Sequence, residues 1–412
     1  MGVNARLLPG HHLRLLEGAA QLVPAMVRAI DRAQRLVHVE TYIFHFANAA
    51  LAVAQALERA AQRGVTVRLV VDAVGTPRLP SEWAQRFDAA GVQWRMYRPL
   101  GWLGLAIPSR WRRLHRKLCV VDGVLGFCGG INLIDDCDDV VLGRLPQPRL
   151  DFALQVSGPV VAEMLEQMEQ LWWRMQAVRS VAERDLRRAW EALREGVPWL
   201  DEVLRAAPPA PPEGMRWPEA RGAAAALLWR DNLRHRHAIE RAYLKAIGSA
   251  RQQVIIANAY FIPGRRLRRA LIQAVRRGVR VQLLIQGKYE RFLQYHAPRP
   301  VHQALLAAGV EIHEYAPSAL HAKVAVVDDR WATVGSSNLD PISLLLAREA
   351  NVVTTDRGFA TALRRRLEHL LRTRGQALDL ATLRRRPWHE KARDALAFAV
   401  MRAVLFLTGH RY

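Results

Sequence analysis

The sequence has few cysteines and no long apolar run, and each shortage narrows what the protein can be. Its 412 residues include three cysteines, and the spacing of Cys119, Cys128 and Cys137 does not match that of metal ligands. We expect buried free thiols in a reducing compartment rather than a disulfide framework. No stretch reaches the roughly 18 consecutive apolar residues that a membrane-spanning helix needs, and the opening residues do not resemble a secretory signal. We therefore do not expect the chain to cross a membrane.

Lysine is also scarce, although the chain is strongly basic. The formal net charge is +22 at pH 7, and of the 60 Lys and Arg residues only five are Lys. Such a charge favours anionic partners, which are nucleic acid, phospholipid headgroups or phosphate esters. Lys117 and Lys323 lie in two similar stretches, HRKLCVVDGVLGFCGGIN (115–132) and HAKVAVVDDRWATVGSSNLD (321–340). These positions indicate that a compact ammonium group is needed there rather than a planar guanidinium.

The two stretches belong to a repeat that runs through most of the chain. VHVETYIF (37–44) resembles IIANAYFI (255–262), and AAGVQWRMYRP (89–99) resembles AAGVEIHEYAP (307–317) with the same offset. In each half, β-rich runs alternate with amphipathic helical patterns, which is typical of βαβ units. We predict an α/β fold of two pseudo-symmetric lobes, each a mostly parallel β-sheet flanked by helices.

A proline-rich segment, AAPPAPPEGMRWPEARG (206–222), interrupts this alternation. Proline and glycine end helices and strands, so the segment predicts a linker between the lobes. The N-terminal lobe is then 1–205 and the C-terminal lobe is 223–380. The remaining residues, 381–412, form a tail that begins basic and becomes apolar.

Two segments could contact a membrane. The apolar part of the tail, 395–407, is a helix candidate that is too short to span a bilayer. With the arginines before it, we expect it to lie on an anionic membrane surface, and packing on the protein body is the alternative. The loop 100–113 combines two tryptophans with arginines. It is either an interfacial loop beside the active site or an ordinary packed loop.

Each motif places a histidine and a lysine two residues apart at the start of an apolar strand. Side chains with this spacing point to one face of the strand. In the second motif these are His321 and Lys323, and Asp328 follows the strand, where it can accept hydrogen bonds from turn amides. Asn338 then offers an amide donor. The first motif repeats the set in His115, Lys117, Asp122 and Asn132.

A pseudo-twofold arrangement would bring the two sets to one active site at the lobe interface. One histidine could attack a phosphorus atom while the other protonates the departing alkoxide. Cationic and amide groups would bind the phosphate oxygens, so we expect no metal and no other cofactor. The phosphate-binding residues are Lys117, Asn132, Lys323 and Asn338.

The two motifs resemble the duplicated HxKxxxxD motif of the phospholipase D superfamily, and the resemblance extends from about Val37 to Thr373. That family places an acidic residue after each motif to orient a histidine, and Asp151 and Glu349 match those positions. Ala347 departs from the asparagine common there, and Gly130 replaces the serine found at Ser336. The resemblance implies a catalytic set of His115, Lys117, Asp122, His321, Lys323 and Asp328, in which the two aspartates act as structural anchors. For the mechanism that it implies, we assign His115 as nucleophile and His321 as acid and base, and the pseudo-symmetry leaves the reverse assignment open.

Further stretches narrow the resemblance. YFIPG (260–264), VETYIF (39–44) and residues 326–352 are similar to bacterial cardiolipin synthases of the short B type. This similarity implies a phosphatidyltransferase that moves a phosphatidyl group from a phospholipid donor to phosphatidylglycerol through a phosphohistidine. Phosphatidylethanolamine is a candidate donor. The protein would then be peripheral, at the cytoplasmic face of the bacterial inner membrane.

Three other functions fit parts of this pattern. With water as acceptor, the same site would be a phospholipase D hydrolase, and no residue distinguishes the two. A superfamily nuclease would suit the positive charge. However, aromatic residues do not alternate regularly with basic ones as base stacking requires, so we expect no nucleic acid partner. A noncatalytic membrane-binding protein would not need two intact motifs.

Overall fold

The structure, a computed structural model, describes residues 6–98, 112–182, 185, 220–231, 235–289, 292–340 and 347–407. With these gaps, the N-terminal unit comprises Arg6–Asp135 and Ala153–Leu227, and the C-terminal unit comprises Asp136–Phe152 and Leu228–Tyr412. The segment Asp136–Phe152 follows the first motif in sequence, yet it packs with the second half of the chain.

Two predicted features lie mostly outside the described residues. Of the linker predicted at 206–222, only 220–222 are described, and they begin strand β11 (Ala220–Arg230). Of the loop at 100–113, only Arg112 and Arg113 are described. The lobe boundaries drawn from the sequence therefore remain predictions.

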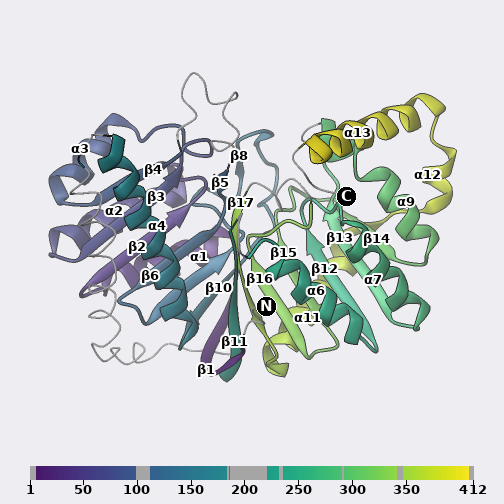
Figure 1. Cartoon of the computed structure of the whole chain (residues 1–412), viewed down its shortest axis with the longest axis horizontal. Coiled ribbons are helices and arrows are strands. Elements are labelled where there is room, and N and C mark those ends of the chain that lie inside the picture. Colours follow the sequence, from purple (N-terminus) through teal and green to yellow (C-terminus); the bar gives the residue numbers. More distant parts are fainter. Residues whose placement is uncertain are drawn as a thin grey trace. The chain divides into compact units, whose positions relative to one another are not determined.

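The N-terminal unit contains a β-sheet with helices on both faces (Figure 1). Its strands lie in the order β11, β1, β10, β7, β6, β2, β3, β4. Helices α1, α2 and α3 pack on one face and α4 packs on the other. Besides β11, the elements are β1 (Leu8–Glu17), α1 (Gly18–Asp31), β2 (Leu36–Thr41), α2 (Asn48–Gln62), β3 (Thr66–Asp72), α3 (Ser81–Ala90), β4 (Gln93–Tyr97), β5 (Arg113–Leu114), β6 (Lys117–Val121), β7 (Leu125–Gly129), β10 (Phe152–Ser157) and α4 (Val160–Ala182).

Strand β3 shows how one run of residues serves two cores. Val67, Leu69 and Val71 belong to the core beneath α1 and α2, whereas Val70 packs with Trp172 of α4. Successive side chains of a strand point to opposite faces, so an uninterrupted apolar run suits a strand that is covered twice.

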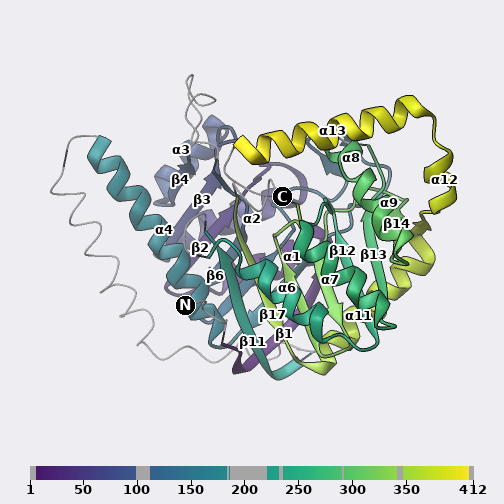
Figure 2. The same cartoon turned by 45° about the vertical axis from the view of Figure 1, so that its right-hand side comes forward.

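The strands of the C-terminal unit lie in the order β18, β14, β13, β12, β15, β16, β17. Helices α6 and α7 lie on one face and α11 on the other, and α13 runs along α8 and α9 (Figure 2). The elements are β8 (Asp138–Asp139), β9 (Gly143–Arg144), α6 (Ala238–Ser249), β12 (Gln253–Asn258), α7 (Arg265–Arg276), β13 (Arg280–Gln286), α8 (Phe292–His296), α9 (Arg299–Ala307), β14 (Glu311–Tyr315), β15 (Lys323–Val327), β16 (Trp331–Gly335), β17 (Ala347–Thr354), α11 (Arg357–Arg374), β18 (Gly375–Ala377), α12 (Leu380–Arg385) and α13 (Trp388–Leu407).

The duplicated α/β organisation is confirmed, because both units run through the same series of elements. Strand β2, helix α2, strand β3, helix α3 and strand β4 are followed by the hairpin β6–β7. The series β12, α7, β13, α9, β14 and β15–β16 repeats this order.

The prediction of mostly parallel sheets needs a correction. Strands β2, β3 and β4 are parallel, as are β12, β13 and β14, but the motif strands β6 and β15 pair antiparallel with β2 and β12. A parallel connection needs a crossover, usually a helix, and the structure describes no helix between β14 and β15. The chain therefore re-enters the sheet at the carboxyl ends of the parallel strands, and each sheet is mixed.

One face of helix α13 packs on the protein body, whereas contact of the tail with a membrane remains a prediction. It packs on α8 and α9, with Ala397 buried and Asp394 Oδ1 2.7 Å from Nδ1 of His296. On its outer side Leu396 and Val400 are 60% and 41% exposed. Within the part of the chain that the structure describes, a helix with both the length and the apolar character to cross a bilayer is absent.

Gly335 offers a test of how tightly the second motif hairpin is packed. A Cβ atom at this position would overlap the Asn351 side chain and lie 2.6 Å from the Ala350 carbonyl oxygen. We expect Gly335→Ala to lower the free energy of unfolding by about 1–3 kcal/mol, measured as a lower Tm by circular dichroism. Gly248 in α6 has no such neighbour within 4 Å. The control Gly248→Ala should leave Tm unchanged or raise it, and equal Tm values for Gly335→Ala and the native protein would contradict the expectation.

Candidate active site

The second motif begins at the edge of the C-terminal sheet where the parallel strands end. Lys323, the first residue of β15, lies opposite Asn258, the last residue of β12. Ligands of α/β sheets usually bind at the carboxyl ends of the parallel strands. Lys323 is fully buried, whereas His321 is only half-buried. The histidine ring is therefore accessible to a ligand at this edge.

His321 is held by a carboxylate from a distant part of the sequence. Its Nδ1 lies 2.6 Å from Oδ2 of Asp151, whose side chain is 2% exposed. The other carboxylate oxygen accepts a hydrogen bond from the backbone amide of Phe152 at 2.8 Å. With the Nδ1 proton donated to Asp151, Nε2 carries the lone pair that a nucleophile or base needs.

Backbone hydrogen bonds fix the same segment beside the histidine. The amide of His321 donates to the carbonyl of Leu150 at 2.8 Å, and the amide of Leu150 donates to the carbonyl of Ala319 at 2.9 Å. Asp151 is thus positioned by main-chain contacts of its own neighbours as well as by its side chain. This arrangement defines the geometry of the carboxylate and imidazole before any substrate binds.

Both motif lysines donate to the carbonyl oxygen of their own motif histidine. Lys117 Nζ lies 2.6 Å from the carbonyl oxygen of His115, and Lys323 Nζ makes the equivalent bond to His321. Burying an ammonium group is costly unless polar groups surround it. A phosphate oxygen bound here would meet a positive charge that water screens weakly.

The turn after β16 contributes buried polar groups. Ser336 Oγ donates to Oε2 of Glu349 at 2.5 Å and accepts from the amide of Ala350 at 3.1 Å. Asn338 is also buried, and its Oδ1 has no hydrogen-bond partner among the described residues. The structure thus places Glu349 against Ser336, and a role of Glu349 in orienting a histidine remains a prediction.

In the N-terminal unit, residues of the first motif lie close to the ring of Tyr42. The rings of His115 and Tyr42 meet edge-on with centroids 5.2 Å apart, and Lys117 Nζ is 5.5 Å from the centroid of Tyr42. Asn132 Oδ1 accepts a hydrogen bond from the amide of Ile43 at 3.2 Å. His115, Lys117 and Asn132 therefore gather around the segment that follows β2. A site shared by His115 and His321 remains a prediction.

The motif aspartates bind turn amides, as expected from their place after a strand. Asp122 accepts hydrogen bonds from the amides of residues 34–36 at 2.8–3.0 Å. Asp328 accepts them from the amides of residues 251–253 at 2.6–2.9 Å. In both units these amides lead into the first strand of the repeat. Each carboxylate thus joins the end of the motif strand to the start of its neighbour.

Comparison with known proteins finds relatives that match the parts of the chain containing both motifs. The family described as "Cardiolipin synthase, PLD-like domain" matches residues 26–139 and 243–371. Cardiolipin synthase B of Shigella flexneri is 37% identical over 401 residues, which cover 97% of this chain and 90% of that protein. Cardiolipin synthase B of Salmonella typhi is 38% identical over 402 residues, with the same coverage. The chain belongs to the cardiolipin synthase family.

A solved structure agrees with this family at the level of fold. The phosphatidylserine synthase of Haemophilus influenzae Rd KW20 matches with a TM-score of 0.65 and 14% identity, over 98% of this chain and 97% of that one. At this identity the likeness concerns the fold alone. The match to the PLD-like family model confirms the resemblance to the phospholipase D superfamily that the motifs indicated.

Two residues beside the motifs of this cardiolipin synthase family member were not predicted as site residues. The sequence could have indicated Tyr42, because it aligns with Tyr260 in the repeat. Arg230, at the end of β11, is buried, and no repeat or motif in the sequence indicates it as a site residue. Burial lowers the pKa of Arg230 to about 10, although the charges of Glu349 and Asp340 act in the opposite direction. Arg230 thus places a positive charge near the carboxylate that binds Ser336.

The aspartate anchors can be tested by comparing neighbours. Asp328 and Asp329 both have a φ of 51°, so alanine at either position carries a similar backbone cost. The carboxylate of Asp329 pairs with Arg364 near the surface, an interaction of small net value. We expect Asp328→Ala to lower the free energy of unfolding by about 2 kcal/mol more than Asp329→Ala, because three amides lose their acceptor. Urea denaturation measures both, and equal losses would show that the anchor adds no stability.

Proposed function

We propose that the protein is a cardiolipin synthase that transfers a phosphatidyl group from a phospholipid donor to phosphatidylglycerol. Its relatives of that name match nearly the whole chain. The observation that carries the mechanism is the buried Asp151 carboxylate on Nδ1 of His321. It fixes the tautomer and leaves Nε2 for chemistry, two residues from the buried ammonium group of Lys323.

The first step forms a covalent intermediate. Nε2 of His115 attacks the phosphorus of the donor phosphodiester, and the bond from phosphorus to the headgroup oxygen breaks. His321 in its protonated form gives a proton to the departing alkoxide. Asp151 stabilises the imidazolium before that proton leaves. A phosphatidyl-histidine and a neutral His321 remain.

The second step transfers the phosphatidyl group. A hydroxyl of phosphatidylglycerol gives its proton to His321 and attacks phosphorus, and the bond to His115 breaks. Cardiolipin leaves, and the histidines return to their starting states. In both steps charge grows on the nonbridging oxygens, where preorganised donors stabilise it. The donors are Lys117, Asn132, Lys323 and Asn338. This mechanism requires His115 and His321 to reach one phosphorus atom.

The reaction would take place on a membrane surface. The net charge of +22 attracts anionic lipid, and the exposed Leu396 and Val400 of α13 can enter the headgroup boundary. We propose a peripheral protein at the cytoplasmic face of the bacterial inner membrane, with phosphatidylglycerol and phosphatidylethanolamine as candidate substrates.

The proposed reaction can be tested with vesicles of labelled phosphatidylglycerol, with and without phosphatidylethanolamine. We expect cardiolipin as the product on thin-layer chromatography. We also expect His115→Ala and His321→Ala to lose at least about 10³-fold in kcat, because each removes a nucleophile or an acid and base. His369→Ala, an exposed change on α11, serves as the control. Phosphatidic acid as the main product would show a hydrolase, and DNA cleavage without lipid turnover would show a nuclease.

Asp151 gives a second test that separates orientation from binding. In Asp151→Asn the carboxylate is replaced by a neutral amide, so the imidazolium loses its partner and the wrong tautomer is favoured. We expect kcat to fall by about 10²–10⁴-fold while KM for lipid stays within about twofold. Asp138→Asn, in the same segment, changes a carboxylate that pairs with the exposed Arg144, and it should retain full activity. A kcat unchanged in Asp151→Asn would refute the assigned role.

A further inference from the structure

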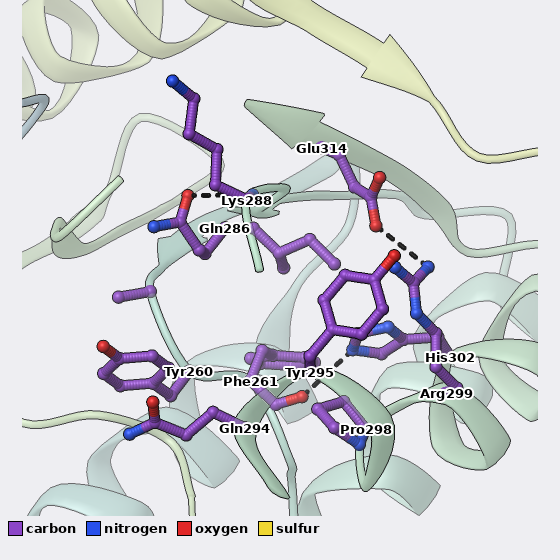
Figure 3. A pocket seen from close by; sticks show the side chains of 12 residues that line it. Tyr260, Phe261, Gln286, Lys288, Gln294, Tyr295, Pro298, Arg299, His302 and Glu314 are labelled. Carbon is purple, nitrogen blue, oxygen red and sulfur yellow. Dashed lines mark hydrogen bonds and ion pairs between the residues drawn. The ribbon is translucent and has the colours of Figure 1, made fainter. Parts of the chain in front are cut away.

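A second group of polar side chains lies together in the C-terminal unit, and Figure 3 shows how they are arranged. They line a pocket with an empty volume of about 410 Å³ at the carboxyl ends of β12, β13 and β14, and residues of α8 and α9 complete its lining. This volume includes space that is open to solvent, so the pocket is a hollow at the surface rather than an enclosed cavity. The mechanism above uses none of its side chains.

Hydrogen bonds connect the lining of the pocket to the residues on either side of the motif histidine. Gln286, in its lining, accepts a hydrogen bond from the amide of Leu320 at 3.1 Å. Ala259, also in its lining, donates from its amide to the carbonyl of Ala322 at 3.0 Å. These bonds flank His321 on both sides. A molecule in the pocket would therefore lie next to the reacting residues.

The charges of the pocket suit a ligand with a single negative charge. Arg299 NH1 lies 2.9 Å from Oε1 of Glu314, so these two charges compensate each other. Lys288 adds one further cation, and its ammonium group has no ion pair among the described residues. In Figure 3 the Lys288 side chain extends away from Tyr295 and His302. The chain has only five lysines, and Lys117 and Lys323 are the motif pair.

The lining also offers hydrogen-bond acceptors. His302 is buried, and its Nε2 lies 3.1 Å from the carbonyl oxygen of Phe261, which assigns the proton to Nε2. Burial, with Arg299 nearby, lowers the pKa of His302 to about 4, so the ring is neutral. Its Nδ1 and the Oε1 of Gln294 have no hydrogen-bond partner among the described residues. Such acceptors match the hydroxyl groups of a polyol.

The outer side of α8 indicates where the ligand comes from. Gln294 and Tyr295 line the pocket, while Phe292 and Leu293 of the same helix are 42% and 37% exposed. Tyr289, just before the helix, is 52% exposed. Apolar and aromatic residues of this kind suit the boundary between lipid headgroups and acyl chains. The pocket would then lie at the depth of the headgroups.

We propose that this pocket binds the phosphoglycerol headgroup of the acceptor lipid. Lys288 pairs with the acceptor's own phosphodiester, and Gln294 and His302 accept hydrogen bonds from the glycerol. The inference rests on the proposed function and assigns its acceptor site. Holding the diol next to His321 favours a lipid alcohol over water, because water cannot use these contacts.

Binding of the soluble headgroup tests the pocket directly. Glycerophosphoglycerol, the deacylated headgroup, is titrated into the full chain by calorimetry, with inorganic phosphate as the comparison. We expect Lys288→Met to raise Kd about tenfold, whereas Lys245→Met, the same change at an exposed position of α6, should have no effect. Equal Kd values for Lys288→Met and the native chain would overturn the proposal. The proposal would also be overturned if inorganic phosphate bound as tightly as the diester, since the pocket would then not distinguish a glycerol headgroup from a free phosphate.

Kinetics on lipid provide the second readout. With donor lipid fixed and phosphatidylglycerol varied in mixed micelles, Lys288→Met and Gln294→Leu should raise KM for the acceptor about tenfold and keep kcat within twofold. Release of the donor headgroup to water should be unchanged. An unchanged acceptor KM in both variants would overturn the proposal. If the native chain makes no cardiolipin, the proposed function fails, and headgroup binding still decides whether the pocket is a site.

Discussion

A buried ammonium group at the end of each sheet is the constraint on which the rest of each unit depends. Lys323 is completely inaccessible and Lys117 nearly so. An uncompensated cation in such a place would cost several kcal/mol, so backbone oxygens must surround it. The carbonyl of the histidine two residues earlier is one of them. The spacing of the motif thus follows from the need to solvate its lysine, and the partly exposed histidine ring follows from the same spacing.

The connectivity of the fold supports this arrangement. Three parallel strands bring their carboxyl ends to one edge, and the chain then returns as an antiparallel hairpin that begins at that edge. The motif aspartate binds the amides that lead into the first strand, so both ends of the motif strand are held. Chemistry and topology are therefore linked: a helical crossover before β15 would have placed His321 at the opposite end of the sheet.

Local patterns made much of this predictable. The alternation of β-rich and helical runs indicated the two repeated series, and the place of Asp122 and Asp328 after a strand indicated that they bind turn amides. The direction of the motif strands was not predictable, because hydrophobicity does not distinguish a return from a crossover. Nor was the contact of Asp151 with His321, since its position after the first motif gives no sign of the partner. Gln294 and His302 lie on short helices and form no periodic pattern, so only the folded chain brings them together.

The segment Asp136–Phe152 belongs to the first half of the sequence but packs in the C-terminal unit, so the second copy depends on the first. The carboxylate that serves the second histidine is encoded with the first. The second copy could therefore not be released as an independent protein without losing the carboxylate that holds its histidine. A gene that was cut between the repeats would yield fragments that must reassociate, and a permuted chain would have to keep this segment attached on both sides. One short segment, encoded with the first repeat and folded into the second unit, thus makes the second unit dependent on the first half of the chain.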